Sequence, residues 1–223
     1  MRDSIILGYS NFGYYSFDGP TEIKYYYVRS SDNVQNKSEP SEVVELKPYV
    51  EILGYNYLID TTTEIDPSFQ GLNVPSNATI PNDITKLRQL KHIRLGGYNL
   101  SGEIPSELWN LPALYEIDLS NNQLTGQFPT NLTLTDPSSI RWIVLNNNQL
   151  SGNIDFIGNF TNLIMLRLYN NEFSGVIPEA ICTNWAGGST YGSEWFELGN
   201  NNLCPPYPSC FYSSSSQNTA DCN

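Results

Sequence analysis

Glu116 and Asp118 are the two side chains whose types and spacing could best support acid–base chemistry. In a strand such a pair points to one face, as the two carboxylates of a glycoside hydrolase do. An open sheet, however, provides no water-excluded pocket that would separate their pKa values. His92 is the single histidine, so every Ser-His-Asp or Cys-His arrangement would have to use it. Because the chain also lacks a phosphate loop, a dinucleotide fingerprint and an EF-hand, we predict that it is not an enzyme and binds no cofactor and no metal.

The elements that would position these side chains are short strands in a repeated pattern. Leu114 begins the run L-x-x-I-x-L-x-x-N-x-L-T-G, and the pattern recurs from Leu90, Ile140 and Leu163 at spacings of 24, 26 and 23 residues. A period in this range predicts a solenoid. In L-x-x-L-x-L the two close apolar residues point to the same side of a strand and therefore line the interior of the coil.

Each unit continues with residues that would close one turn of the coil. An asparagine follows the strand in most units, while Tyr98 takes this place in the unit that begins at Leu90. Its amide can bond backbone groups that have no ladder partner, so we predict a column of asparagines. The Ser-Gly-x-Ile-Pro segments combine a glycine turn with a proline that can start a helical turn, as at residues 105–109. Degraded units are expected at Ile65 and Phe196.

The combined pattern resembles the plant-type leucine-rich repeats of receptor ectodomains and polygalacturonase-inhibiting proteins, which also occur in secreted or surface proteins of bacteria, particularly Bacteroidetes. The C-terminal run N-N-N-L-C-P-P-Y-P-S-C at residues 200–210, with Cys222 beyond it, resembles the cap of that bacterial group more closely. The resemblance covers about residues 60–223. It implies an α/β solenoid, which is a right-handed coil with a parallel β-sheet on its concave face and a small β segment before it.

Three parts are expected along the chain. Residues 1–48 show no repeat, and two β-rich runs within them look like the last two strands of a fibronectin type III domain. Such a sandwich needs about 90–100 residues, so this segment is the end of a longer domain, a hairpin packed on the first repeat through Tyr14, Tyr15 and Phe17, or a disordered tail. Residues 49–192 would hold the repeats, and residues 193–223 the last degraded repeat and a disulfide cap.

All the cysteines, Cys182, Cys204, Cys210 and Cys222, lie near the C-terminus. Their even number predicts disulfides and an oxidising compartment, with three possible pairings. A zinc site is the competing interpretation, which the lack of C-x-x-C disfavours. The resemblance implies Cys204–Cys210 together with Cys182–Cys222, as in the L-C-x-x-P-x-x-C cap of plant-type repeats.

Composition narrows the partners. The net charge is −12 at pH 7, and charged residues make up 15% of the chain. This balance opposes binding to nucleic acid and to anionic membranes, both of which favour basic patches. No apolar run approaches the 18 or more residues of a membrane span, and the first residues do not form a signal peptide. We expect a secreted or cell-surface protein whose signal peptide is not present in this chain.

The outward positions of the short strands form the expected binding surface on the concave face. They combine an acidic middle, an aromatic column and two arginines, which are residue types common at interface hot spots. Aromatic rings there could equally stack on sugars. The candidate ligand-binding residues are His92, Arg94, Glu116, Asp118, Trp142, Met165, Arg167, Tyr169, Trp195 and Glu197.

Other interpretations of these residues stay open. The tryptophans could simply fill space between strands, and Arg94 could pair with Asp118 and Arg167 with Glu197 in a solvated sheet. The loops at residues 73–78 and 186–192 are rival binding sites, because loops often carry function.

We therefore predict a non-catalytic extracellular binding module that recognises a protein partner, as an adhesion, receptor or inhibitor protein. The alternatives are a carbohydrate-binding accessory module that takes a glycan ligand, and a structural spacer in a larger surface protein.

Overall fold

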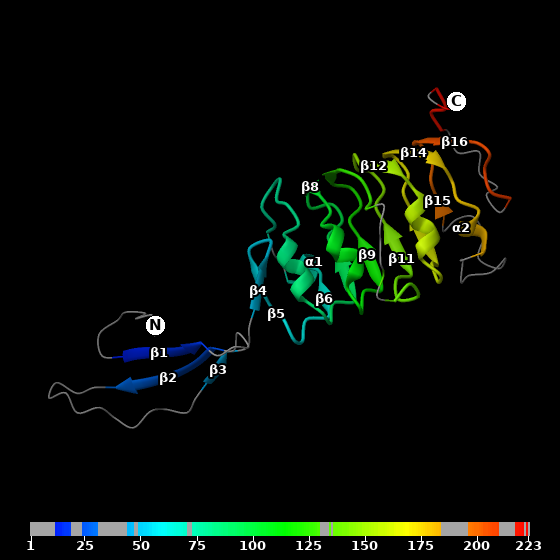
Figure 1. Cartoon of the computed structure of the whole chain (residues 1–223). Coiled ribbons are helices and arrows are strands. Elements are labelled where there is room, and N and C mark those ends of the chain that lie inside the picture. Colours follow the sequence, from blue (N-terminus) through cyan, green and yellow to red (C-terminus); the bar gives the residue numbers. More distant parts are fainter. Residues whose placement is uncertain are drawn as a thin grey trace.

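The structure is a computed structural model that describes residues 12–18, 24–30, 44–46, 49–70, 73–129, 134, 136–183, 196–209, 217–220 and 222. Along the chain, a small antiparallel sheet comes first, and the coil, whose first parallel strand begins at Glu64, follows (Figure 1). The expected order of a β segment followed by a solenoid is therefore confirmed.

The N-terminal sheet has three strands, β1 (Phe12–Asp18), β2 (Lys24–Ser30) and β3 (Val44–Leu46), with β2 in the centre and both pairings antiparallel. The pairing of β2 with β3 confirms the two predicted β-rich runs, and β1 adds a strand that was not predicted. The likeness to a fibronectin type III domain stays a prediction. The expected contacts of this segment involve side chains outside the described part of the structure: Tyr14, Tyr15 and Phe17.

A β-hairpin that the sequence pattern did not predict covers the first end of the coil. It consists of β4 (Tyr49–Ile52) and β5 (Tyr55–Leu58). Leu53 and Gly54 connect them with φ of 54° and 87°, which is the two-residue turn that matches the twist of a hairpin. The inner face of the hairpin buries Val50, Ile52 and Tyr57 in the core.

The main sheet has six parallel strands, one from each repeat, in chain order. Each turn of the coil returns the chain one strand further along, so neighbours in the sheet are neighbours in the repeat series. The degraded units at Ile65 and Phe196 both contribute a strand, as predicted. The strands are β6 (Glu64–Ile65), β7 (His92–Arg94), β9 (Glu116–Asp118), β11 (Trp142–Val144), β13 (Met165–Arg167) and β15 (Phe196–Glu197).

Inward side chains of this sheet form aligned apolar columns. Ile93, Ile117, Ile143 and Leu166 share one register, and each has a relative exposure of 0%. The side chains two residues later form a second column that is also fully buried. Each such side chain contributes roughly 1.5–3 kcal/mol relative to leaving it in water, so the columns hold the stack together. The second column consists of Leu95, Leu119, Leu145, Leu168 and Leu198.

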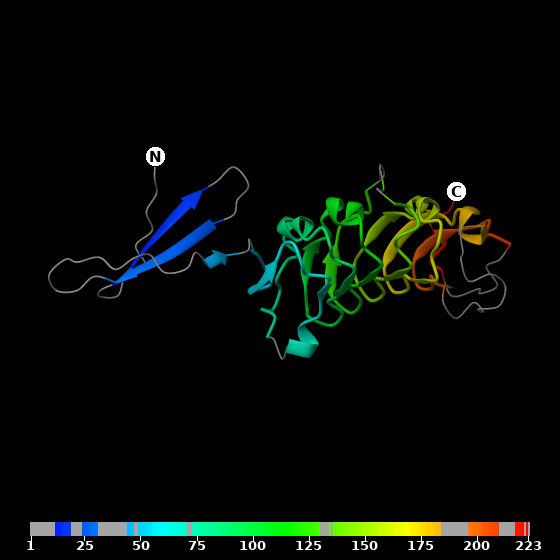
Figure 2. The same ribbon diagram turned by 90° about the horizontal axis from the view of Figure 1, so that it is seen from below.

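Short helical turns lie in a row along one side of the coil (Figure 2). The predicted turn at residues 105–109 is observed as η2 (Ser106–Asn110), and η1 (Asn82–Lys86) and η3 (Asp155–Asn159) are its equivalents. Two further short helices are α1 (Pro67–Gln70) and α2 (Ala180–Thr183). An aromatic cluster packs beneath the turns, in which Phe128 and Phe156 stack with ring centroids 3.5 Å apart.

Two smaller parallel sheets join the repeats after the main strands. One pairs β8 (Ser101–Glu103) with β10 (Gln123–Thr125). The other contains β12 (Ser151–Asn153), β14 (Glu172–Val176) and β16 (Asn202–Cys204).

A ladder of buried or half-buried asparagines runs between the main and smaller sheets, as predicted. Asn148 Nδ2 donates to the carbonyls of Leu119 and Leu145 at 3.0 Å, and Asn148 Oδ1 accepts from the Leu124 N–H at 3.0 Å. Each amide therefore ties its own turn to the preceding repeat. The same bonds recur at Asn122, Asn171 and Asn201.

The disulfide pairing implied by the resemblance is wrong. Cys204 pairs with Cys222, with their Cα atoms 5.5 Å apart, and Cys182 is also in a disulfide. The described cysteines are therefore all oxidised, which contradicts a zinc site made of free thiolates. Cys210 lies outside the described residues.

The path of the C-terminal tail explains the observed pair. The Asn218 N–H donates to the Asn201 carbonyl at 2.8 Å, and Gln217 Nε2 donates to the Leu198 carbonyl at 2.9 Å. These bonds run the tail alongside β16 and bring Cys222 next to Cys204 at the end of that strand. Spacing within the motif could not reveal this, because the pairing depends on where the tail returns.

Candidate functional site

The outward positions of the main sheet form two columns of unlike side chains. In the first outward column Glu64, His92, Glu116, Trp142 and Met165 are direct neighbours. The second outward column holds Arg94, Asp118, Val144, Arg167 and Glu197. Neighbouring strands lie about 4.8 Å apart, so residues from different repeats can contact one ligand.

A charged network joins three of these strands. Arg94 Nη2 and Nε donate to the two carboxylate oxygens of Glu116 at 2.7 and 3.1 Å, and Arg94 Nη1 also pairs with Glu64. His92 Nδ1 lies 2.9 Å from Glu116 Oε2. We call this group the β6–β9 network. It fixes the orientation of the Arg94 guanidinium, because a two-point contact with a carboxylate is geometrically specific.

The protonation states in this network follow from its contacts. Burial by itself raises the pKa of Glu116, but hydrogen bonds from Arg94 and His92 and their charges outweigh it, so the pKa of Glu116 lies below its ordinary value. The hydrogen bond to Glu116 raises the pKa of Arg94, and burial opposes this shift. Glu116 is therefore ionised near neutral pH, as an acceptor for both partners must be.

Of the two ion pairs considered from the sequence, one is confirmed and one is wrong. Arg167 Nε lies 3.1 Å from Glu197 Oε2, as considered. Arg94 pairs with Glu116 and Glu64 rather than with Asp118. The Ser120 N–H and hydroxyl both bond Asp118 Oδ1, at 2.9 and 2.7 Å, which holds the Asp118 carboxylate against its own strand end.

The remaining predicted residues are exposed to different degrees. Trp142 and Tyr169 are half-buried, whereas Met165 is 7% exposed and mainly fills space between strands. Trp195 lies outside the described residues, as does the rival loop at residues 186–192. The other rival loop, at residues 73–78, is tied to the next repeat because the Asn77 N–H donates to the Asn99 carbonyl at 3.1 Å.

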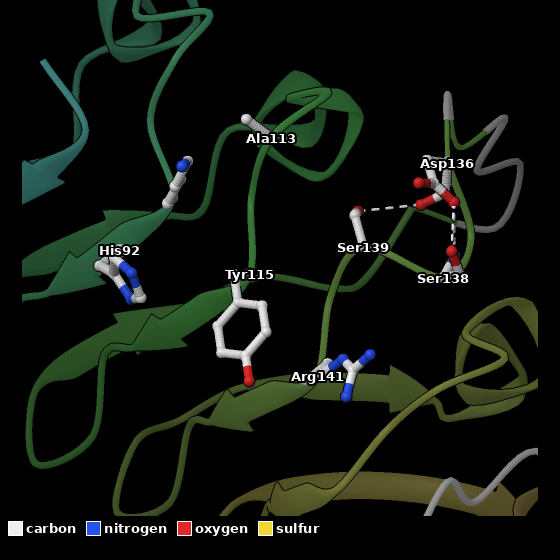
Figure 3. Close-up of a pocket in the computed structure, with 8 residues that line it drawn as sticks. His92, Ala113, Tyr115, Asp136, Ser138, Ser139 and Arg141 are labelled. Atoms are coloured by element: carbon white, nitrogen blue, oxygen red, sulfur yellow. Dashed lines mark hydrogen bonds between the residues drawn. The ribbon is translucent and has the colours of Figure 1, made fainter. Parts of the chain in front are cut away.

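A pocket of about 440 Å³ opens beside the first outward column, at the starts of β7, β9 and β11 (Figure 3). Tyr115 is central to its wall. The His92 ring lies 5.7 Å from the Tyr115 ring, and the Arg141 guanidinium carbon lies 5.8 Å from the same ring centroid. The pocket adjoins the β6–β9 network because His92 belongs to both. Its lining residues are Lys91, His92, Ala113, Tyr115, Asp136, Ser138, Ser139 and Arg141.

The pocket lies where the unit that begins at Leu114 ends. This unit has 26 residues between its start and the next, compared with 24 and 23 for the units on either side. The turn that ends this unit is pinned by Asp136, whose Oδ1 accepts from the Ser138 N–H and hydroxyl at 2.9 and 2.7 Å. These bonds lower the pKa of Asp136. The pocket residues other than His92 were not predicted from the sequence.

Within the described ranges there is no group of three or more His, Cys, Asp or Glu side chains that could hold a metal ion. The same part of the chain contains no helix that is long and apolar enough to cross a membrane.

Comparisons with known proteins agree with this architecture. The family model described as Leucine Rich Repeat matches residues 89–111, 113–134 and 162–184. A comparison with the curated proteins finds no match. No enzyme family is indicated.

Among solved structures, the ectodomain of the receptor kinase SOBIR1 from Arabidopsis thaliana is 24% identical and superposes with a TM-score of 0.50, covering 89% of this chain and 85% of that one. A chain of the BIR3–SERK2 complex, also from Arabidopsis thaliana, is 34% identical with a TM-score of 0.48, covering 59% of this chain and 66% of that one. The peptide hormone receptor RGFR1 in complex with RGF2 is 28% identical with a TM-score of 0.45, covering 63% and 23%.

This chain thus spans less than two thirds of the length of the matched chains in the BIR3–SERK2 and RGFR1 structures. The family model and the SOBIR1 superposition indicate the same fold. The aligned interior columns, the asparagine ladder and these matches together show that the chain carries leucine-rich repeats and folds as a leucine-rich repeat solenoid.

Proposed function

We propose that this chain is a non-catalytic extracellular module that binds a protein partner through the concave face of its main sheet. One observation carries the proposal. The inward registers repeat nearly the same residue in every unit, whereas the outward registers place His92, Glu116, Trp142 and Met165 side by side. A scaffold that is uniform inside and varied on one face presents a specific surface, as repeat proteins that bind along a concave side do.

The composition of that face supports recognition of a protein. Trp, Tyr and Arg are the residue types that dominate interface energetics. Trp142 and Arg167 lie on adjacent strands here, and Tyr169 follows the second of them. The paired Arg94 and Glu116 provide a fixed charge pattern that can complement a partner.

The extracellular part of the proposal is supported by oxidised cysteines, since stable disulfides mark oxidising compartments. A thiol titration of the denatured protein tests it, and we expect no free sulfhydryl. Four reactive thiols would contradict secretion.

A displayed library of random peptides tests the binding face. We expect the wild-type chain to enrich a sequence family, and the triple variant Trp142→Ala, Arg167→Ala, Tyr169→Ala to bind the enriched peptides at least about tenfold more weakly. The matched control is Gln123→Ala, Gln149→Ala, Glu172→Ala, which removes three exposed side chains on the edge beside the asparagine ladder. Equal losses in both variants, or no enrichment at all, would overturn the proposal.

Carbohydrate binding is the second candidate function, because the half-buried Trp142 ring on the first outward column could stack on a sugar. A glycan array separates the two. Binding to a glycan that Trp142→Ala abolishes, together with no peptide enrichment, would favour the carbohydrate.

A further inference from the structure

The pocket beside the first outward column has a charge opposite to that of its surroundings. The whole chain has a net charge of −12, yet two of the lining residues are the cations Lys91 and Arg141. Among the described residues neither cation forms an ion pair. The one lining carboxylate, Asp136, is held by two hydrogen bonds from Ser138 and forms no ion pair with either cation. The two cations therefore outnumber the single carboxylate of the lining and are available to an anionic ligand.

The cations are presented by an ordered wall. Arg141 lies over the Tyr115 ring, and His92 contacts the same ring from the neighbouring strand. His92 is in turn hydrogen-bonded to Glu116 of the β6–β9 network. Because a guanidinium held on an aromatic face loses less freedom on binding an anion, this arrangement is prepared for a carboxylate.

The concave face next to the pocket favours a basic group rather than an acidic one. Its arginines are already paired, Arg94 with Glu64 and Glu116 and Arg167 with Glu197. Asp118 has no cationic partner among the described residues and accepts only from Ser120 in the contacts of this face. The nearest unneutralised charge on the sheet is thus negative, and it would attract a basic group.

We propose that the pocket binds a side-chain carboxylate of the protein partner while Asp118 receives a basic side chain of the same segment. The inference rests on the proposed function, since both subsites serve a partner that lies across the concave face. Tyr115 directly precedes β9 and Asp118 ends it, so the subsites are about 10 Å apart at roughly 3.3 Å per residue. Side chains of an extended segment alternate between its two faces, so an acidic and a basic residue two or four positions apart can both reach this surface.

Selection from the random-peptide library tests the proposal. The wild-type chain should enrich an Asp or Glu two or four positions from a Lys or Arg. Changing that acid to its amide should weaken binding to wild type about tenfold, as expected for one charge-assisted contact, and should not affect binding to the variant Lys91→Gln, Arg141→Gln. The converse variant Asp118→Asn should lose the preference for the basic residue and keep the acidic one.

The outcomes separate the inference from the function on which it rests. Absence of any enriched peptide would overturn the proposed function itself. Enrichment that depends on Trp142, Arg167 and Tyr169 but shows no acidic preference would leave the function standing and overturn the pocket assignment.

A second measurement does not depend on the library. Titration of the isotope-labelled wild-type chain with the α-amide of N-acetyl-glutamate, whose only carboxylate is the side chain, should shift the amide resonances of Lys91, Tyr115 and Arg141, whereas the α-amide of N-acetyl-glutamine, which has no carboxylate, should not. The Lys91→Gln, Arg141→Gln variant should keep the wild-type spectrum elsewhere and lose this response. Equal shifts with both compounds, or none with either, would overturn the proposal.

Discussion

Two columns of the same coil show opposite behaviour. The asparagine ladder places the same residue at Asn122, Asn148 and Asn171 and makes the same three kinds of bond each time. The first outward column, on the face of the same strands, changes from histidine to glutamate to tryptophan. Where a side chain must satisfy backbone groups that lack a ladder partner, one residue type fits. Where it faces solvent, the fold accepts many types, and recognition can use that freedom.

The β6–β9 network lies between these extremes. Its residues differ from repeat to repeat, as on a free surface, yet Glu116 has a side-chain exposure of 11% and serves both Arg94 and His92. Part of the concave face therefore contributes to stability as well as to the proposed binding. For variants of the β6–β9 network, both the free energy of unfolding and the binding affinity must be measured.

The largest effect is expected for the ladder. Asn148→Ala removes the donor to the Leu119 and Leu145 carbonyls and the acceptor for the Leu124 N–H. Leaving such groups without partners costs about 1–3 kcal/mol each when they are out of water, so we expect a loss of about 2–4 kcal/mol in the free energy of unfolding. Urea denaturation followed by circular dichroism measures it, with the exposed neighbour Gln149→Ala as control. A loss under about 1 kcal/mol would show that the ladder is not what distinguishes the two columns.

The second effect concerns the network and depends on pH. Glu116→Gln keeps the shape of the side chain but removes the charge that Arg94 and His92 contact. Because removing one partner of a partly buried charge pair exposes the other to an unfavourable environment, we expect a loss of about 1–3 kcal/mol at pH 7.

The direction of the pH dependence follows from the pKa of Glu116, which hydrogen bonds from Arg94 and His92 hold below 4.5 against the opposing effect of burial. A carboxylate with a lowered folded-state pKa stabilises the fold above its unfolded pKa and loses that contribution as pH falls through the folded pKa. The advantage of wild type over Glu116→Gln should thus be full at pH 7 and shrink below pH 4.5. A difference that stays constant across this range would contradict the assignment.

The comparison also shows which features the sequence could predict. Columns such as Leu119 and Leu145 and the ladder followed from spacing alone, because a repeated apolar position on a short strand has one inside to face. The partner of Arg94 did not follow. Direct register favours Asp118, but the Ser120 N–H and hydroxyl hold Asp118 Oδ1 against its own strand end, and the long arginine side chain reaches the first outward column instead.

Features at the irregular ends and loops were the least predictable. The Cys204–Cys222 pair depends on a tail that returns along β16, which no local motif encodes. The β4–β5 hairpin replaces the start of the first repeat because the open end of a coil must be covered. The pocket at Tyr115 depends on how a 26-residue unit packs beside its neighbours. In each of these cases the structure is determined by contacts between segments rather than by the spacing of the repeats.

A smaller effect is expected for the exposed ion pair on the concave face. Arg167 and Glu197 have side-chain exposures of 38% and 40%, so water screens their attraction. A double-mutant cycle with Arg167→Gln and Glu197→Gln should give a coupling energy below about 1 kcal/mol. The same cycle on Arg94 and Glu116 should give a clearly larger value, and equal couplings would remove the distinction between the network and the free surface.

The smallest effect on the free energy of unfolding is expected at Asn147, which directly precedes Asn148 in the chain. This residue is part of an exposed ladder, in which Asn147 Nδ2 donates to Asn121 Oδ1 and Asn170 Nδ2 donates to Asn147 Oδ1, both at 2.6 Å. Its φ is 58°, so Asn147→Gly keeps the left-handed backbone without strain.

The lost side-chain bonds of Asn147 are exchanged for bonds to water, so the free energy of unfolding should change by less than about 1 kcal/mol. Asn147→Ala should cost roughly 1 kcal/mol more than the glycine variant, because a Cβ is unfavourable at positive φ. Thermal and urea unfolding of the two variants beside Asn148→Ala measure the contrast. If Asn147→Gly destabilised the coil as much as Asn148→Ala, the exposed asparagines would stabilise the coil as much as the buried or half-buried ones. Burial would then not explain why asparagine is repeated in the ladder.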